Sequence, residues 1–127
     1  MPHRVIHFEI HATEPAAAAK WYGDLFGWRT QELYDGEYFL VMTGDGPGID
    51  GGILRRRGPA AENGAPVNAF VCTIGVDDID AHWAKALAAG ASEALPKMAV
   101  PGVGWSAYIH DPFGNIIGMH QADPAAK

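Results

Sequence analysis

The chain has 127 residues, of which 48% are hydrophobic and 19% charged, and its formal net charge is −6. These values are typical of one globular domain with a hydrophobic core. The acidic balance argues against a nucleic-acid partner, because phosphate backbones bind basic surfaces. A single cysteine, Cys72, excludes an internal disulfide and a cysteine-rich zinc site. The sequence has no signal peptide and no apolar run long enough to cross a bilayer, so we expect a cytoplasmic protein without a membrane partner.

The first half of the chain predicts a strand over residues 4–12 and then a helix. Thr13 is the expected N-cap of this helix, Pro15 suits its first turn, and Gly27 suits its left-handed C-cap. One apolar face recurs at helical spacing, formed by Ala18, Trp21, Tyr22 and Leu25. Three further strands are predicted over residues 28–33, 38–42 and 51–55.

The second half predicts the same series of elements. A strand over residues 68–76 precedes a helix that begins at Asp77 as its capping residue and ends at Gly90. The apolar stripe of this helix consists of Ile79, Trp83, Ala86 and Leu87. Strands follow over residues 93–98, 105–110 and 115–121, the last after the turn-forming Asp-Pro-Phe-Gly-Asn sequence.

The two halves are therefore interpreted as two copies of one unit. Trp83 and Leu87 repeat Trp21 and Leu25 at the same spacing, and both halves read strand, helix, strand, strand, strand. We predict an α+β fold of two tandem βαβββ modules within a single domain, residues 1–122. Its parts are module one (3–57), a linker (58–66) and module two (67–121), with a tail at 123–127.

Three blocks resemble the vicinal oxygen chelate superfamily, which includes glyoxalases, bleomycin resistance proteins and extradiol dioxygenases. They are Ile-His-Phe-Glu-Ile at residues 6–10, Trp-Tyr-Gly-Asp-Leu-Phe-Gly-Trp at 21–28 and Asp-Pro-Phe-Gly-Asn-Ile-Ile-Gly at 111–118. Among these, the chain resembles the glyoxalase-related members of undefined function. The resemblance implies curved mixed sheets that form a cleft, and a homodimer.

The resemblance also implies four positions for metal ligands, one on the first and one on the last strand of each module. His7 occupies the first and is a competent ligand. The other three fall on the stretch Gly51-Gly52-Ile53-Leu54, on Val71 and on Gly118, none of which offers a ligating side chain. A catalytic divalent ion usually needs three protein ligands. The inherited metal site is therefore predicted to be mostly lost, and the cofactor stays unknown.

Alternation along a strand places His7, Glu9 and His11 on one face. Two catalytic interpretations remain open. A divalent metal could be rebuilt around His7, Glu9 and His120, or Glu9 could act as a general base beside His7. Either would suit a lyase or isomerase that works through an enolate-like intermediate.

Aromatic side chains on or beside the predicted strands favour a small-molecule site. The candidate ligand-binding residues are Trp28, Trp105, Tyr108 and His120. The sequence therefore predicts a protein that binds a small organic molecule without the inherited metal. The alternative is the lyase or isomerase described above.

Overall fold

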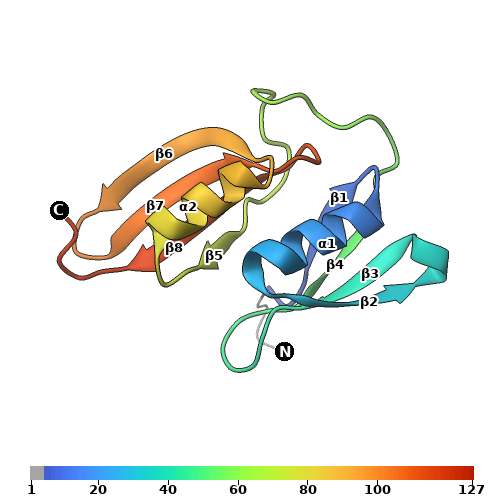
Figure 1. Ribbon diagram of the computed structural model, residues 1–127, viewed down its shortest axis with the longest axis horizontal. Coiled ribbons are helices and arrows are strands. Elements are labelled where there is room, and N and C mark those ends of the chain that lie inside the picture. Colours follow the sequence, from blue (N-terminus) through green and yellow to red (C-terminus); the bar gives the residue numbers. More distant parts are fainter. Residues whose placement is uncertain (1–4) are drawn as a thin grey trace. The chain divides into compact units, whose positions relative to one another are not determined.

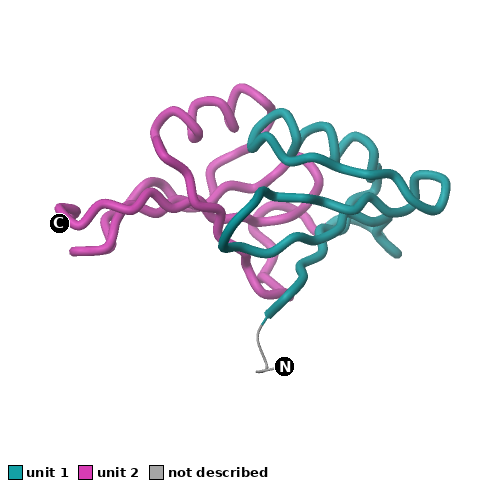
Figure 2. Tube along the Cα trace, turned by 90° about the horizontal axis from the view of Figure 1, so that it is seen from below, with its two compact units in different colours: residues 1–60 teal, residues 61–127 magenta. Residues whose placement is uncertain are grey.

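The computed structural model describes residues 5–127, so residues 3 and 4 at the start of predicted module one lie outside the described residues. The chain divides into two compact units, residues 1–60 and residues 61–127 (Figure 2). Each unit contains one α-helix and one four-stranded mixed sheet. Neither helix of the described part combines the length and apolar character that a membrane span requires.

Unit 1 contains the predicted elements of the first half in the predicted order (Figure 1), but the strand predicted over residues 4–12 begins only at Phe8 within the described residues. They are β1 (Phe8–Ala12), α1 (Pro15–Phe26), β2 (Arg29–Leu33), a 3-10 turn (Tyr34–Gly36), β3 (Tyr38–Met42) and β4 (Gly51–Arg55). The sheet order is β1-β4-β3-β2. β1 pairs with β4 in parallel, and the other neighbours are antiparallel. β4 therefore separates β1 from β3.

Unit 2 repeats this arrangement. Its elements are β5 (Thr73–Gly75), α2 (Ile79–Ala88), β6 (Ser92–Val100), β7 (Gly104–His110) and β8 (Ile116–Ala122). The sheet order is β5-β8-β7-β6, again with a parallel first pair and antiparallel neighbours. The predicted fold, two tandem βαβββ modules of the α+β class, is confirmed.

The predicted helix starts are each wrong by one residue. The N-cap of α1 is Glu14 rather than Thr13, and no side chain caps this end. The N-cap of α2 is Asp78 rather than Asp77, and its carboxylate accepts a hydrogen bond from the Ala81 N–H at 3.1 Å. Gly27 does adopt the predicted left-handed conformation after α1, with φ of 76°.

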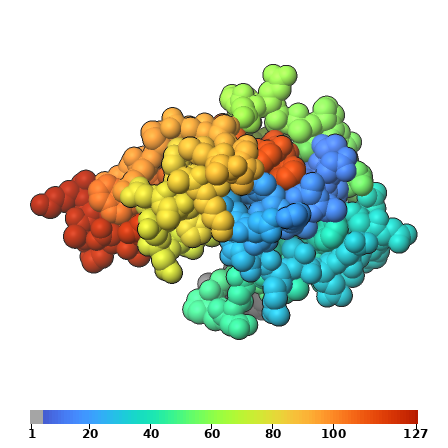
Figure 3. All heavy atoms as spheres, viewed as in Figure 1, coloured from blue at the N-terminus to red at the C-terminus, as the bar shows by residue number. Residues whose placement is uncertain are grey.

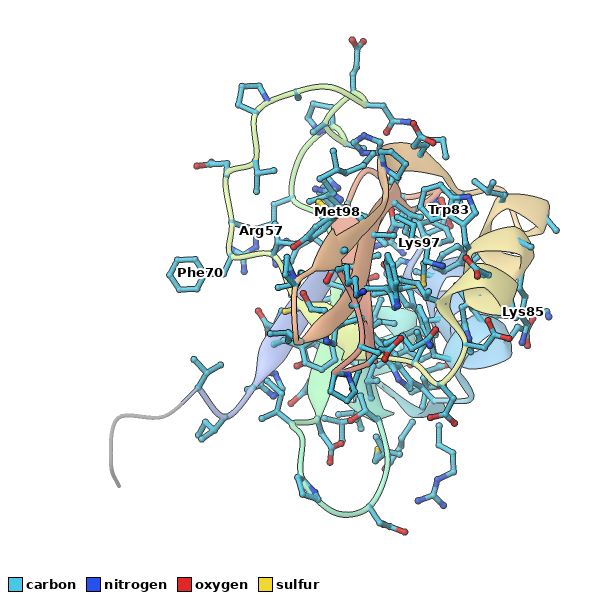
Figure 4. The ribbon with its side chains drawn as sticks, turned by 90° about the vertical axis from the view of Figure 1, so that its left-hand side faces the viewer. Arg57, Phe70, Trp83, Lys85, Lys97 and Met98 are labelled. Carbon is cyan, nitrogen blue, oxygen red and sulfur yellow. The ribbon has the colours of Figure 1, made fainter. Side chains whose placement is uncertain are left out.

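The strand predicted over residues 68–76 is reduced to the three residues of β5. Its parallel partner β8 begins only at Ile116, and Thr73 already pairs with Gly118. In this register residues 68–70 extend beyond the start of β8 and have no strand partner among the described residues, and an extended segment needs one for its backbone groups. Phe70 in this segment is 95% exposed and projects away from the strands (Figure 4).

Each helix packs on one face of its own sheet and builds the core there. In unit 1 the buried strand residues on this face are Ile10, Phe39, Val41 and Ile53, which pack with Tyr22 and Leu25 of α1. In unit 2 they are Ala107, Ile109, Ile117 and Met119, with Ile79 and Ala86 of α2. The other predicted stripe residues of α2 are less buried: Trp83 is half-buried and Leu87 is exposed.

The residues after β8 lie against the turn between β6 and β7 at one end of unit 2 (Figure 3). The Gly102 N–H donates to the Ala126 carbonyl at 2.9 Å, and the Asp123 N–H donates to the Val103 carbonyl at 2.9 Å. Ala126 is buried as a result. The tail thus closes the end of the β6–β7 hairpin.

Candidate functional site

We call the sheet face that is not covered by the unit's own helix its open face. Strand alternation and the registers assign residues to it. In unit 1 these include Glu9, His11, Tyr38, Leu40, Gly52 and Leu54. In unit 2 they include Thr73, Met98, Ser106, Tyr108, Gly118 and His120.

A polar cluster of His7, Glu9, His11 and Tyr38 lies on the open face of unit 1. The Tyr38 hydroxyl donates to Glu9 Oε2 at 3.3 Å and lies 3.0 Å from His7 Nε2. The imidazoles of His7 and His11 lie 3.8 and 4.0 Å from different oxygens of the Glu9 carboxylate. His7 and Glu9 are 44% and 43% exposed, so both can meet a ligand while they contact each other. The predicted pair of catalytic residues therefore does lie together.

Gly52 allows Tyr38 to reach this cluster. Tyr38 begins β3 and Glu9 lies on β1, and β4 runs between them. Two strand spacings amount to about 10 Å. The Tyr38 side chain spans this distance by passing directly over β4. A Cβ on Gly52 would overlap the Tyr38 hydroxyl and the edge of its ring. Glycine in a strand interior often marks such a close approach, and here it places a phenol beside a carboxylate.

The environment of Tyr38 disfavours ionisation of its phenol. Desolvation raises the pKa of Tyr38, and the nearby negative charge of Glu9 and the hydrogen bond to it raise that pKa further. The phenol is therefore protonated at neutral pH and keeps its O–H as a donor. The cluster then combines a carboxylate that can accept a proton with a neutral phenol that can donate a hydrogen bond.

We expect the ionisation of Tyr38 to have a midpoint above the usual tyrosine value of 10.0. The difference between the tyrosinate absorbance titrations of the wild type and Tyr38→Phe isolates this group. The pKa of Tyr38 is higher in the folded state than in the unfolded state. Tyr38 therefore contributes its full stabilisation below the unfolded-state pKa, and this contribution is lost as the pH rises through the folded-state pKa. Glu9→Gln should move the midpoint toward the usual value. A Tyr38 midpoint at or below that value would contradict the described cluster.

The open face of unit 2 carries two of the predicted ligand-binding residues, Tyr108 and His120. The Tyr108 ring lies over Gly118, where an added Cβ would stand 2.8 Å from Tyr108 Cε2 and 2.8 Å from Thr73 Oγ1. His120 Nδ1 lies 2.9 Å from the Ser106 hydroxyl. Gly118 thus corresponds to Gly52. Each glycine lies in the last strand of its unit, pairs with the first strand, and leaves space for a tyrosine ring above it.

The other two predicted ligand-binding residues, Trp28 and Trp105, lie on the helix-covered faces. Trp28 stacks on Tyr22 at a ring separation of 5.3 Å and also contacts Phe8 and Phe26. Trp28 is therefore part of the aromatic packing between α1 and its sheet.

Trp105 lies beneath Lys97, whose Nζ is 4.7 Å from the ring centroid, and its indole N–H donates to Asp123 at 3.0 Å. This hydrogen bond is the main reason why the pKa of Asp123 is lowered. Lys97 also pairs with Asp80 of α2 at 3.1 Å. Figure 4 shows Lys97 on the α2 side of β6 and Met98 on the other side. Strand alternation thus separates Trp105 from Tyr108 and His120.

The side chains present do not fit the divalent metal implied by the resemblance. Within neither described unit do three His, Cys, Asp or Glu side chains lie close enough together to bind an ion. His7 and His11 contact opposite oxygens of Glu9, and His120 pairs with Ser106 in the other unit. Tyrosines also occupy the space above Gly52 and Gly118, where side chains from the last strands would project.

Sequence reasoning missed Tyr38 as a member of the site. The signal that could have revealed it is the glycine pair Gly51-Gly52 inside a predicted strand. We interpreted these glycines as missing ligands, although a glycine there also indicates that another group approaches the backbone closely.

Comparisons with known proteins agree with this architecture. The family model described as Glyoxalase/Bleomycin resistance protein/Dioxygenase superfamily matches residues 4–119. A curated relative from Mycobacterium tuberculosis, named "Putative glyoxylase CFP32", is 29% identical over 124 residues. The match covers 91% of this chain and 44% of that relative, so the chain spans less than half of its length.

Solved structures show the same fold. A glyoxalase family protein from Bacillus cereus has a TM-score of 0.76 and 19% identity, with 96% of this chain and 95% of that chain covered. The fosfomycin resistance protein FosX from Mesorhizobium loti has a TM-score of 0.67 and 18% identity, with coverages of 97% and 95%. Because the repeated βαβββ units and the family model coincide over nearly the whole chain, this protein belongs to the glyoxalase/bleomycin resistance protein/dioxygenase superfamily.

Proposed function

We propose that this chain binds a small organic molecule on the open face of unit 1, without a divalent metal. The observation that carries the proposal is the cluster of His7, Glu9 and Tyr38, held in mutual contact while remaining accessible. Half-buried Leu40 and Leu54 lie on the same face. A few polar groups converging beside apolar surface are typical of small-molecule sites.

The metal-free part of the proposal is supported by the chemistry of the donor set. A divalent ion needs several ligands around one point, whereas Glu9 already has an imidazole near each of its oxygens. Tyr38 fills the space over Gly52, so β4 contributes no ligand at that position. Direct hydrogen bonds from these side chains would then hold the ligand.

A thermal-shift screen of small neutral and ionic organic compounds tests this proposal, on protein treated with a chelator. A compound that binds the folded state at a hundredfold excess over its Kd should stabilise it by about 2.7 kcal/mol. Leu40→Gln, which places an amide on the open face of unit 1, should abolish the rise in Tm produced by such a compound. The matched control is Leu87→Gln, because Leu87 is an exposed leucine of α2, and it should leave the rise unchanged.

Two results would contradict the proposal. One is a screen in which no compound stabilises the chelated protein, and the other is stabilisation that appears only when a divalent metal is added back. Stabilisation that survives Leu40→Gln would move the binding site away from this face and would also contradict the proposal.

A second candidate function is that of a lyase or isomerase with Glu9 as the general base. The hydrogen bond between Tyr38 and Glu9 favours it specifically. A carboxylate can remove a proton from the carbon beside a carbonyl group. A neutral hydroxyl next to that carboxylate can stabilise the resulting oxyanion by donating a hydrogen bond to it.

A further inference from the structure

We propose that the Asn63–Gly64 peptide is a site of covalent modification, at which the asparagine cyclises to a succinimide and hydrolyses to aspartate and isoaspartate. The proposal includes a role for Ser92, whose hydrogen bond to Asn63 slows the reaction. The site lies in the segment over residues 57–73, every residue of which is exposed. It involves the open face of neither unit, so the proposed function does not depend on it.

Asn63 and Gly64 are the two central residues of a tight turn. The Ala65 N–H donates to the Glu62 carbonyl at 3.0 Å, and Gly64 has φ of 92°. A positive φ at the third residue is typical of a type II turn and favours glycine there. A Cβ added to Gly64 would meet no heavy atom within 4 Å, and among the described residues no carbonyl accepts the Gly64 N–H. The Gly64 nitrogen is therefore open to solvent and free to react.

The reaction requires only this nitrogen, the Asn63 side chain and water. The deprotonated Gly64 nitrogen attacks Cγ of Asn63, and the new C–N bond closes a five-membered succinimide ring. The bond from Cγ to the side-chain nitrogen breaks, and that nitrogen takes up the proton and leaves as ammonia. Water then opens the ring at either of its carbonyl carbons, which gives aspartate or isoaspartate. One water is consumed and one ammonia is released.

The other two asparagines of the chain, Asn68 and Asn115, are less favourable sites. A Cβ on the following residue crowds the attacking nitrogen, and glycine has none. Asn68 precedes an alanine, and Asn115 precedes the β-branched Ile116. Asn115 is also restrained, because its N–H and its side-chain amide both donate to the carboxylate of Asp111. Asparagine is a chemically labile residue in general, and here the lability is concentrated at Asn63.

The side chain of Asn63 is tied to the sheet of unit 2. Its Nδ2 donates to the Ser92 hydroxyl at 3.0 Å, and Ser92 is the first residue of the edge strand β6. Ring closure requires the amide to turn toward Gly64 and its nitrogen to leave. The hydrogen bond holds that same nitrogen, so it opposes both steps.

The two products have different effects on this contact. Aspartate keeps the length of the backbone and can accept a hydrogen bond from the Ser92 hydroxyl. Isoaspartate directs the main chain through its Cβ and Cγ, which lengthens the turn between Glu62 and Ala65 and separates it from β6. Either product makes the formal net charge of −6 more negative by one, because a carboxylate replaces a neutral amide.

Incubation of the purified protein at mildly alkaline pH, followed by tryptic peptide mass spectrometry, tests the site. The peptide over residues 58–85 contains both Asn63 and Asn68, and its fragmentation distinguishes them. A sample digested without incubation corrects for deamidation during digestion. We expect aspartate and isoaspartate at Asn63 before either product appears at Asn68 or Asn115, together with an acidic shift of the intact protein in isoelectric focusing.

Two variants assign the acidic shift to one residue. Asn63→Gln should abolish the early shift, because ring closure through the longer glutamine side chain needs a six-membered ring. The matched control is Asn68→Gln, which changes another exposed asparagine and should leave the shift unchanged. Deamidation of Asn68 or Asn115 ahead of Asn63, or an unchanged early shift in Asn63→Gln, would overturn the assignment of the site.

Ser92→Ala tests the restraint. Ser92 is exposed, so this variant should fold, as judged by its Tm, and Asn63 should deamidate faster in it than in the wild type. In denaturant the hydrogen bond is absent from both proteins, and their rates at Asn63 should be equal. Equal rates in the two folded proteins would overturn the role of Ser92, and so would a faster rate in Ser92→Ala that persists in denaturant.

Discussion

Asp111→Ala is expected to lower the free energy of unfolding by about 3 kcal/mol, the cost of leaving several buried donors without an acceptor. Asp111 is 3% exposed and is the buried charged residue of the described core. Its Oδ1 accepts from the N–H groups of Phe113 and Asn115 at 2.8 and 2.9 Å, and its Oδ2 accepts from the Asn115 side chain at 3.1 Å. These bonds hold the turn that aligns β7 with β8. Urea unfolding followed by circular dichroism measures the loss.

Asp111→Asn is the matched control for this change. The amide oxygen can replace Oδ1 as the acceptor for both backbone N–H groups, and only the acceptor for the Asn115 side chain is lost. We expect a cost of about 1 kcal/mol. Equal midpoints for the alanine and asparagine variants would show that these hydrogen bonds do not stabilise the turn.

Gly104→Ala is expected to lower the free energy of unfolding by about 2–3 kcal/mol, because overpacking a filled site forces the backbone to move. An added Cβ would overlap the Gln121 carbonyl oxygen, which belongs to the backbone of β8. It would also stand 2.8 Å from His120 Nε2. The side chain can turn aside, but the strand carbonyl cannot do so without breaking the pairing of β7 with β8.

Gly75→Ala is the control for this second prediction. Gly75 also lies in a strand of unit 2, and a Cβ there meets no heavy atom within 4 Å. Its urea midpoint should stay close to that of the wild type. A Gly104→Ala protein as stable as Gly75→Ala would contradict the described close approach of β7 and β8.

Local patterns in the sequence were sufficient for most of the fold. The strands over residues 38–42 and 51–55 were predicted with the observed bounds, since alternation and turn residues are encoded within a few positions. The segment at 68–71 was not predicted correctly. A strand there would need a partner more than forty positions away in the chain, and the β-propensity of a segment does not reveal whether such a partner exists.

The candidate site was predictable in part. The period of a strand predicted that His7 and Glu9 share one face; His7 lies one residue before β1, and its contacts with Glu9 and Tyr38 are what bring it to that face. The same period puts Trp105 and Tyr108 on opposite faces of the sheet. Both were nevertheless predicted as ligand-binding residues, because the aromatic residues were considered without regard to the face on which each lies. Trp28 belongs to the packing against α1, and an aromatic residue in a core cannot be distinguished from one in a binding site by its identity alone.

The amino-acid order accounts for the repeated βαβββ unit, the family blocks and the shared face of His7 and Glu9, because each of these depends on neighbours in the chain. The presence of Tyr38 beside Glu9 depends instead on the sheet order β1-β4-β3. A side chain on β3 can reach β1 only by crossing β4, and it can cross only where β4 carries no side chain of its own. Gly52 meets that condition, so a glycine interpreted as a missing metal ligand becomes the space that completes the candidate site.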